Sequence, residues 1–90
     1  MSDIKKRFEL SIKMIQNLKQ KPNDNELLIL YGLYKQSGGD CVITKPTGIL
    51  NFKEKSKWES WYKYRGMTSE DAMTKYSNYV MTLIEKYGVN

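Results

Sequence analysis

The stretch Leu-Leu-Ile-Leu-Tyr-Gly-Leu-Tyr-Lys-Gln, from Leu27 to Gln36, combines features that are unusual for a helix whose only task is packing. On an α-helix with about 3.6 residues per turn, one side of the stretch collects five side chains: Leu27, Leu28, Tyr31, Tyr34 and Lys35. Leu30 and Leu33 fall on the opposite side, which predicts that they enter a protein core. The helix therefore presents aromatic rings, hydroxyl groups and a cation beside an aliphatic strip. This combination favours a ligand with an aromatic base, a phosphate and an apolar tail.

The sequence also marks the ends of this helix. Asn23, followed three residues later by Glu26, forms a close relative of the capping box, in which each side chain bonds to the backbone of the other residue. The pair Gly38-Gly39 interrupts the pattern, because glycine commonly follows the last turn of a helix. We therefore predict a helix from the Asn23 cap to about Ser37.

Three further helices are predicted from apolar spacing and capping residues. The first runs from Ser2-Asp3 to about Leu18, and its apolar face consists of Ile4, Phe8, Ile12, Ile15 and Leu18. The third covers about Phe52 to Tyr64 and ends before Gly66, and the last lies between the Thr68 cap and Gly88. The inward face of the last helix is predicted to hold Ala72, Met73, Tyr76, Val80, Leu83, Ile84 and Tyr87.

The segment between residues 38 and 51 follows no helical period. It is rich in turn-forming residues, but its interspersed apolar residues predict that it packs across the other elements. Val42-Ile43-Thr44 resembles a strand, yet the chain offers no second strand to pair with it. We predict an all-α fold, a four-helix bundle that forms a single domain over residues 1–90.

Composition argues against several classes of protein. The 90 residues include no histidine and one cysteine, Cys41, so thiol–imidazole catalysis, ordinary zinc sites and an internal disulfide lack their usual residues. No serine or cysteine has an identifiable base, and we expect neither enzymatic activity nor a cofactor. The sequence has no apolar run of the ~18 residues that cross a bilayer and no signal peptide, which predicts a soluble, cytoplasmic protein.

Charge directs attention to an anionic partner. The formal net charge is +5 and the isoelectric point is about 9.3, which favours nucleic acid, a membrane surface or a phosphorylated small molecule. Lys35 and Lys57 are the lysines with aromatic surroundings, near Tyr31, Tyr34 and Trp58. An ammonium group and a tyrosine hydroxyl can both hold a phosphate, while an aromatic ring can stack on a purine. The alternative is that the tyrosines belong to the core or its rim and the lysines only extend to solvent.

Several runs of residues together resemble the acyl-CoA-binding protein family. The most specific are residues 30–36, Leu-Tyr-Gly-Leu-Tyr-Lys-Gln, and residues 55–61, Lys-Ser-Lys-Trp-Glu-Ser-Trp, about twenty residues later. Further matches are Gly39-Asp40, residues 66–73, Tyr76 and the closing Tyr87-Gly88. The resemblance spans nearly the whole chain. It implies an up-down-down-up bundle that binds medium- to long-chain fatty acyl-CoA thioesters without transforming them.

The resemblance also implies a set of ligand contacts. The positions that match the family's head-group site are Tyr31, Tyr34, Lys35, Lys57 and Tyr76, with Gly32 and Leu33 inside the same motif. It places the adenine near Tyr31 and the 3′-phosphate near Lys35, Lys57 and the Tyr31 hydroxyl. It places the acyl chain in an apolar groove between the second and third helices, at Leu27, Leu28 and Ser56.

The chain departs from the family pattern at several positions. Gln16 occupies a place where the family commonly has a basic residue, and Ser56 replaces the usual alanine beside the acyl chain. Ser77 replaces a larger apolar residue against the first helix, which predicts looser packing there. Residues 38–51 differ in length and in the spacing of Pro46 and Gly48, so chain-length preference is the property least defined by the resemblance.

Three other functions fit parts of the sequence. A basic helical nucleic-acid-binding module would need a continuous basic stripe, whereas the lysines here are spread over several faces. A membrane-surface binder would need a Trp- or Phe-rich edge on the first helix, although a transient membrane contact during loading is compatible with the main interpretation. A purely structural domain would leave Tyr31, Lys35 and Lys57 without a purpose. We therefore expect a monomeric carrier that meets acyl-CoA-producing and acyl-CoA-using enzymes and binds no nucleic acid.

Overall fold

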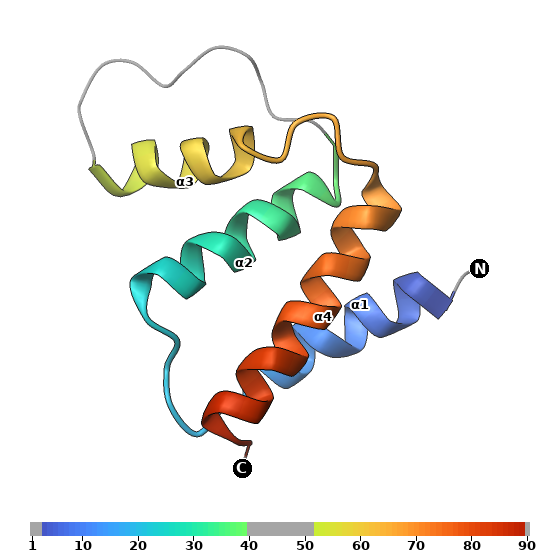
Figure 1. The fold of residues 1–90 in the computed structure, drawn as a ribbon, viewed down its shortest axis with the longest axis vertical. Helices are drawn as coiled ribbons and strands as arrows, with labels where there is room; N and C mark the ends of the chain where they lie inside the picture. Colours follow the sequence, from blue (N-terminus) through green and yellow to red (C-terminus); the bar gives the residue numbers. More distant parts are fainter. Residues whose placement is uncertain (1–2, 40–51, 90) are drawn as a thin grey trace.

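The computed structural model describes residues 3–39 and 52–89 of the chain. Four helices account for most of these residues: α1 (Asp3–Ile15), α2 (Asp24–Gln36), α3 (Phe52–Tyr62) and α4 (Ser69–Tyr87) (Figure 1). The described residues form no strand beyond an isolated bridge between Leu18 and Val89. The all-α prediction is confirmed. Cys41 and the predicted packing of the segment up to residue 51 lie outside the described residues.

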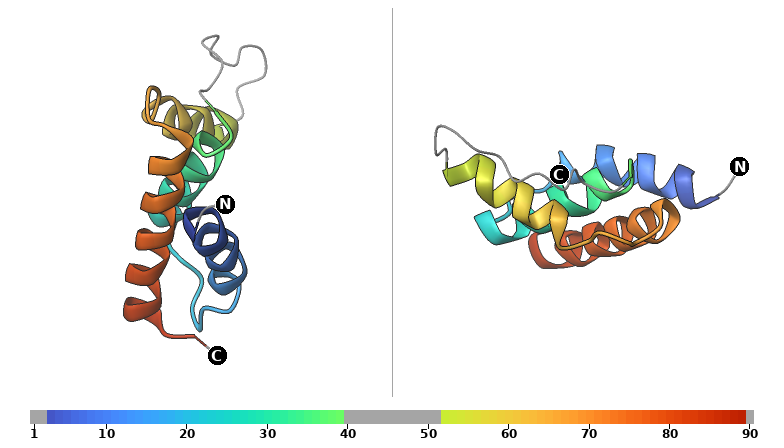
Figure 2. Two further views of the ribbon diagram at one scale, coloured as in Figure 1. Left: turned by 90° about the vertical axis from the view of Figure 1, so that its right-hand side faces the viewer. Right: turned by 90° about the horizontal axis from the view of Figure 1, so that it is seen from above.

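Contacts between the helices define their directions. Arg7 of α1 donates a hydrogen bond to Asn78 of α4, and the Leu18–Val89 bridge follows further along both segments, so α1 and α4 run the same way. Tyr31 of α2 contacts Lys57 of α3, and four residues later on both helices Lys35 contacts Trp61, so α2 and α3 are parallel. The end of α2 contacts the start of α4, where the side-chain amide of Gln36 donates to the carbonyl of Met67 at 2.8 Å. The arrangement is the predicted up-down-down-up bundle, with α1 and α2 against the same side of α4 (Figure 2).

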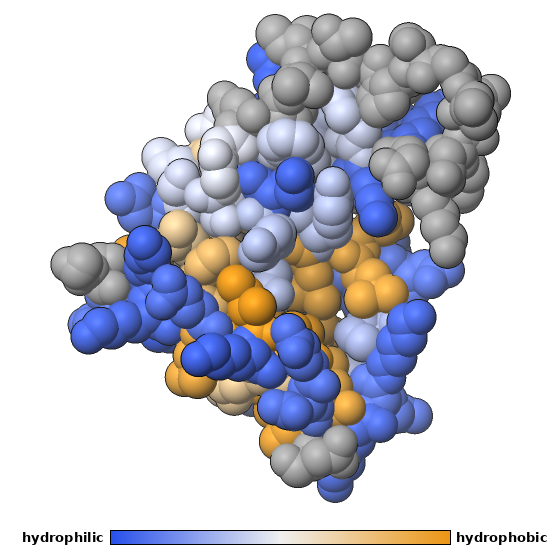
Figure 3. All heavy atoms as spheres, turned by 180° about the vertical axis from the view of Figure 1, so that it is seen from behind, coloured by the Kyte–Doolittle hydropathy of each residue, from blue (hydrophilic) through white to orange (hydrophobic). Residues whose placement is uncertain are grey.

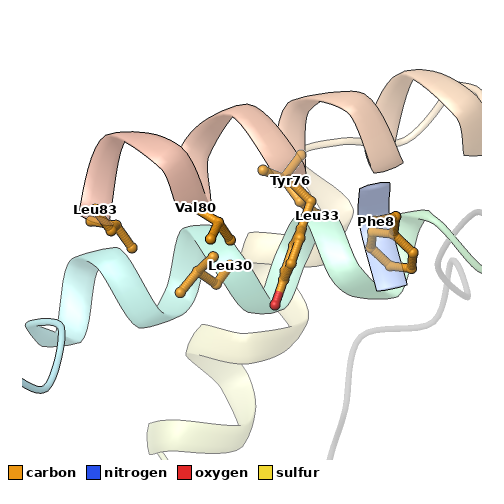
Figure 4. Close-up of a cluster of buried hydrophobic side chains, with 6 residues drawn as sticks. All are labelled: Phe8, Leu30, Leu33, Tyr76, Val80 and Leu83. Atoms are coloured by element: carbon orange, nitrogen blue, oxygen red, sulfur yellow. The ribbon is translucent and has the colours of Figure 1, made fainter. Parts of the chain in front are cut away.

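The hydrophobic core lies between α4 and the other two helices that pack on it. It is formed by Phe8 of α1, Leu30 and Leu33 of α2, and Tyr76, Val80 and Leu83 of α4 (Figure 4). All six are less than a tenth exposed, which confirms the predicted inward sides of α2 and α4. Burial of these side chains supplies the main favourable free energy of folding, because the chain is too short for a second core.

Ser77 is buried in α4 beside this core. Its side chain is 1% exposed, and its hydroxyl finds no hydrogen-bond partner among the residues that the structure describes. A buried hydroxyl without a partner opposes folding by about 1–3 kcal/mol. The sequence indicated weaker packing at Ser77, and the structure adds an unsatisfied polar group at the same place.

Two helices end earlier than predicted. The first was expected to reach Leu18, but α1 ends at Ile15 because the next amides bond three residues back and Leu18 then pairs with Val89. The third was expected to reach Tyr64, but α3 ends at Tyr62. The amides of Tyr64 and Arg65 bond three residues back, and the chain turns at Gly66 with a φ of +90°. Apolar spacing continues through both turns, so it could not locate these ends.

Glu26 does more than the predicted capping box. The box is present: the Glu26 amide donates to the Asn23 side chain at 2.8 Å, and the Asn23 amide donates to Oε1 of Glu26 at 2.9 Å. The carboxylate also accepts hydrogen bonds from Lys86 Nζ and from the Tyr87 hydroxyl, each at 2.7 Å. Together with the pairing of Leu18 and Val89, these bonds tie the end of α4 to the start of α2. We call this set of contacts the C-terminal junction.

The C-terminal junction predicts acid sensitivity. Hydrogen bonds from Lys86, and then from Tyr87, lower the pKa of Glu26 from 4.5 to about 2. A carboxylate whose pKa is lower in the folded protein stabilises the fold above its unfolded pKa, and this contribution is lost as the pH falls toward the folded pKa. The stability that Glu26 provides should therefore be complete above pH 4.5 and disappear between about pH 4.5 and 2.

Urea unfolding of the wild type and of Glu26→Gln across this pH range measures the contribution directly. The difference in unfolding free energy between the two proteins should shrink steadily as the pH falls below 4.5. Glu85→Gln, which changes an exposed carboxylate near the end of α4, is the matched control. A constant difference between wild type and Glu26→Gln at all pH values would contradict the assignment.

Candidate functional site

A hollow of about 390 Å³ lies between α1 and α2, above α4. Its lining combines aliphatic and aromatic side chains with one amide: Ile12, Ile15, Gln16, Pro22, Leu27, Leu30, Tyr31, Tyr34 and Tyr76. Figure 3 shows the molecule from this side, with hydrophobic residues gathered across the middle and hydrophilic residues around them. The hollow therefore has an apolar interior and a polar rim, as small-molecule sites commonly do.

Three aromatic rings from three helices meet beside this hollow, and two of them, Tyr34 and Tyr76, line it. Tyr34 of α2 stacks on Phe8 of α1 with centroids 6.1 Å apart, and Tyr76 of α4 meets Phe8 edge to face at 5.2 Å. Tyr76 is 5% exposed, whereas Tyr34 is 49% exposed. Burial, with the neighbouring Tyr34 as a second cause, raises the pKa of Tyr76 above its ordinary value of 10. Its hydroxyl consequently keeps its proton and can donate a hydrogen bond.

A second hollow, of about 310 Å³, also has Tyr34 in its lining. Its lining joins α1, the end of α2 and α3: Phe8, Tyr34, Lys35, Ser37, Gly38 and Trp61. Tyr34 lines both hollows, so its half-exposed ring is a wall that the two hollows share. The wall of rings could stack on a planar aromatic group, and Lys35 brings a cation to one side of it.

Two lysines are placed reciprocally across α2 and α3. Nζ of Lys57, from α3, lies 5.5 Å from the centroid of the Tyr31 ring on α2. Nζ of Lys35, from α2, lies 4.9 Å from the centroid of the Trp61 ring on α3. Each ammonium group thus stands over an aromatic face of the opposite helix, a favourable electrostatic arrangement.

Gly32 sets the distance between these two helices. A Cβ atom at this position would lie 2.5 Å from the carbonyl oxygen of Ser60 and 2.7 Å from a ring carbon of Tyr64. Only a residue without a side chain leaves room for this close approach of α2 to α3. The two lysine–ring pairs lie on either side of the approach, so Gly32 positions both of them.

The structure brings together most of the residues singled out in the sequence. Leu27, Tyr31, Tyr34 and Tyr76 line the first hollow, Lys35 lines the second, and Lys57 stands beside Tyr31. Gly32 and Leu33 are buried, the former against α3 and the latter in the core. Leu28 and Ser56 are partly buried and lie outside both hollows. Gln16, the neutral departure on α1, lines the first hollow.

Two residues of the site were not among the predicted ligand contacts. Phe8 was expected only as part of the core, and its buried ring does belong there while it also lines the second hollow. Trp61 belongs to the motif of residues 55–61, and its spacing of four from Lys57 places both on adjacent turns of α3. That spacing was the available signal for Trp61, but its partner on α2 could not be known before the helices were packed.

The described residues hold neither a metal site nor a membrane span. No three side chains of the types His, Cys, Asp or Glu are grouped as metal ligands within residues 3–39 and 52–89. None of the helices in that part of the chain is both long and apolar enough to cross a membrane. The side chains that line the two hollows can stack on an aromatic group, cover apolar groups and bind an anion through lysine and tyrosine.

Comparison with known proteins gives consistent matches over nearly the full chain. A family model described as Acyl CoA binding protein matches residues 5–80. Acyl-CoA-binding protein 2 of Saccharomyces pastorianus is 48% identical over 81 residues, which cover 89% of this chain and 92% of that protein. The crystal structure of Oryza sativa Acyl-CoA-Binding Protein 2 is 34% identical with a TM-score of 0.82, covering 92% of this chain and 90% of that chain. The solution structure of the Acyl Coenzyme A Binding Protein from yeast is 43% identical with a TM-score of 0.70, covering 90% and 94%.

Proposed function

We propose that this chain, which belongs to the acyl-CoA-binding protein family, carries medium- to long-chain fatty acyl-CoA thioesters without transforming them. Family membership supports acyl-CoA binding and a carrier role. The observation that carries the finer proposal is the placement of two cations and three tyrosines around one pair of hollows. A ligand with a phosphorylated nucleotide at one end and a hydrocarbon chain at the other matches that distribution of polar and apolar groups.

The nucleotide head is proposed to bind at the rim shared by α2, α3 and α4. Tyr31, with Lys57 over its ring, offers an aromatic face, a hydroxyl and a cation within one small region. Lys35 adds the second cation, and Tyr34 and Tyr76 add a wall with a protonated hydroxyl. Charge-assisted hydrogen bonds from lysine to phosphate are about twice as strong as neutral ones, so the phosphates would provide much of the head-group affinity.

The acyl chain is proposed to extend from the head group along apolar side chains. The family resemblance points to Leu27, Leu28 and Ser56, and Leu27 shares the first hollow with Ile12 and Ile15. Each methylene group removed from water contributes about 0.8 kcal/mol, so even a partly covered chain adds substantially to affinity. Binding would also keep the thioester out of micelles and membranes while it passes between the enzymes that make and use it.

The whole chain, residues 1–90, is proposed to act as a single cytoplasmic binding domain and as a monomer. Its one cysteine suits a reducing compartment, and the apolar helix faces are covered by one core. Contact with a membrane would be transient, during loading or release of the ligand.

Calorimetric titration with hexadecanoyl-CoA, free CoA and hexadecanoate tests the proposal. We expect one-to-one binding of the thioester, with each free fragment bound at least about ten-fold more weakly, because each makes only part of the contacts. Equal affinity for free hexadecanoate would exclude the head-group site. If the folded protein bound none of these three compounds, the carrier proposal would fail, and nucleic-acid binding would be the next hypothesis to test.

A further inference from the structure

The indole ring of Trp61 contacts the last turn of α2 and the chain that directly follows it. Its Nε1–H group donates a hydrogen bond to the carbonyl oxygen of Gly39 at 3.1 Å. The ammonium group of Lys35 lies over the face of this ring, 4.9 Å from the ring centroid. Lys35 belongs to α2 and Gly39 lies three residues beyond its end, so the indole contacts the helix once and the following segment once. Trp61 is partly buried and also lines the second hollow with Lys35.

We propose that Trp61 is a positioning residue for the phosphate contact of Lys35. This inference rests on the proposed function, since it assumes that Lys35 receives a phosphate of the acyl-CoA head group. Trp61 acts through Lys35: it holds the ammonium group in place before the ligand arrives, and the hydrogen bond to Gly39 in turn fixes the indole.

The physical basis is preorganisation of a flexible side chain. A lysine side chain has many rotamers and loses that freedom when it holds a ligand, which opposes binding. An ammonium group that already stands on an aromatic face has lost part of this freedom in the unliganded protein. The ring attracts the cation without neutralising its charge, so the N–H groups that point away from the ring remain able to donate to a phosphate oxygen.

Trp58 provides a matched comparison on the same helix. Its ring stacks on Tyr62 with centroids 4.8 Å apart, and neither residue lines the two hollows. Replacing Trp58 by leucine removes an equally large ring from α3 and leaves both residues of the Lys35–Trp61 pair in the chain. It therefore separates a general effect of losing tryptophan from the specific effect proposed here.

The test is a double-mutant cycle on hexadecanoyl-CoA binding, measured by calorimetry. The proteins are the wild type, Trp61→Leu, Lys35→Met and the double variant, each shown by circular dichroism to be folded. Trp61→Leu should weaken binding roughly two- to five-fold in the wild-type background, the range expected for a partly exposed cation–π contact. With methionine at position 35 the same change should have almost no effect, because there is no cation left to position.

The control substitution Trp58→Leu should have the same effect, large or small, in both backgrounds. Trp61→Phe keeps an aromatic face but loses the N–H donor, so its affinity should fall between wild type and Trp61→Leu. It also keeps the test usable if leucine prevents folding.

Proton chemical shifts of the Lys35 ε-methylene in the unliganded protein give an independent readout. The indole ring should shift these resonances upfield, and the upfield shift should vanish in Trp61→Leu.

The outcomes separate this inference from the proposed function. Effects of Trp61→Leu and Lys35→Met that multiply independently would overturn the positioning role alone, as would ordinary ε-methylene shifts in the wild type. Failure of the wild type to bind hexadecanoyl-CoA would overturn the proposed function and this inference together.

Discussion

Replacing Lys35 and Lys57 together by methionine should weaken hexadecanoyl-CoA binding by at least about 100-fold. Each hydrogen bond from a charged donor contributes about 1.5–3 kcal/mol, and 1.4 kcal/mol is a factor of about ten in affinity. Methionine keeps the apolar stem of each side chain but removes the ammonium group. The remaining affinity should also depend less on salt, because screening acts on the charges that have been removed. Titration at low and at high ionic strength measures both effects.

The matched control makes the same change in net charge at two lysines that line neither hollow. Lys5 and Lys6 are exposed on the first turns of α1 and line neither hollow. Lys5→Met combined with Lys6→Met lowers the net charge from +5 by the same amount and should change affinity by less than about three-fold. If this control weakened binding as strongly, the overall charge and not the two positioned lysines would account for affinity.

Replacing Gly32 by valine should destabilise the protein by about 1–3 kcal/mol, the range for an overfilled interior. The first side-chain atom would meet the backbone carbonyl of Ser60 at 2.5 Å, so α2 and α3 would have to move apart. Moving them apart would also separate Lys57 from the Tyr31 ring. We therefore expect weaker acyl-CoA binding as well as a lower midpoint of urea unfolding.

Gly38→Val is the control for this prediction. A Cβ atom at Gly38 would meet only the carbonyl oxygen of Lys35, at 3.4 Å, so the substitution should cost much less stability. The comparison keeps the chemistry of the substitution constant and changes only the space around it. Equal stability of Gly32→Val and the wild type would show that α2 and α3 can separate freely, and that Gly32 does not set their spacing.

Local patterns in the sequence were sufficient for the helices and their sidedness. The caps at Asn23 and Thr68 were predicted from residue type, and both side chains accept the expected backbone hydrogen bond. The division of α2 into a buried side with Leu30 and an outer side with Tyr34 follows from helix geometry alone, and the exposures agree. The family was predicted from two specific motifs and is confirmed by the match over residues 5–80.

Features that depend on partners distant in sequence could not be predicted. The sequence predicts Glu26 as part of a capping box, but its carboxylate also accepts two hydrogen bonds from residues about sixty positions later. The early end of α1 at Ile15 depends on Leu18 pairing with Val89, which no local pattern indicates. Likewise, Lys35 could be assigned to a cationic site, whereas its pairing with Trp61 required the spacing of α2 and α3. The individual ligand contacts remain predictions that the binding experiments will test.

The C-terminal junction has a practical consequence for anyone who wishes to tag or immobilise this protein. The last turn of α4 holds Glu26, the residue directly before Leu27 of the proposed ligand groove, and the Lys19 amide donates a hydrogen bond to the Gly88 carbonyl at 2.9 Å. A fluorophore, affinity handle or fusion partner joined directly after Val89 would disturb the C-terminal junction, which holds the start of the proposed ligand groove in place. The first turn of α1, at the other end of the chain, is exposed and lies away from the C-terminal junction (Figure 1). A sensor built on this domain should therefore be anchored through its N-terminal end.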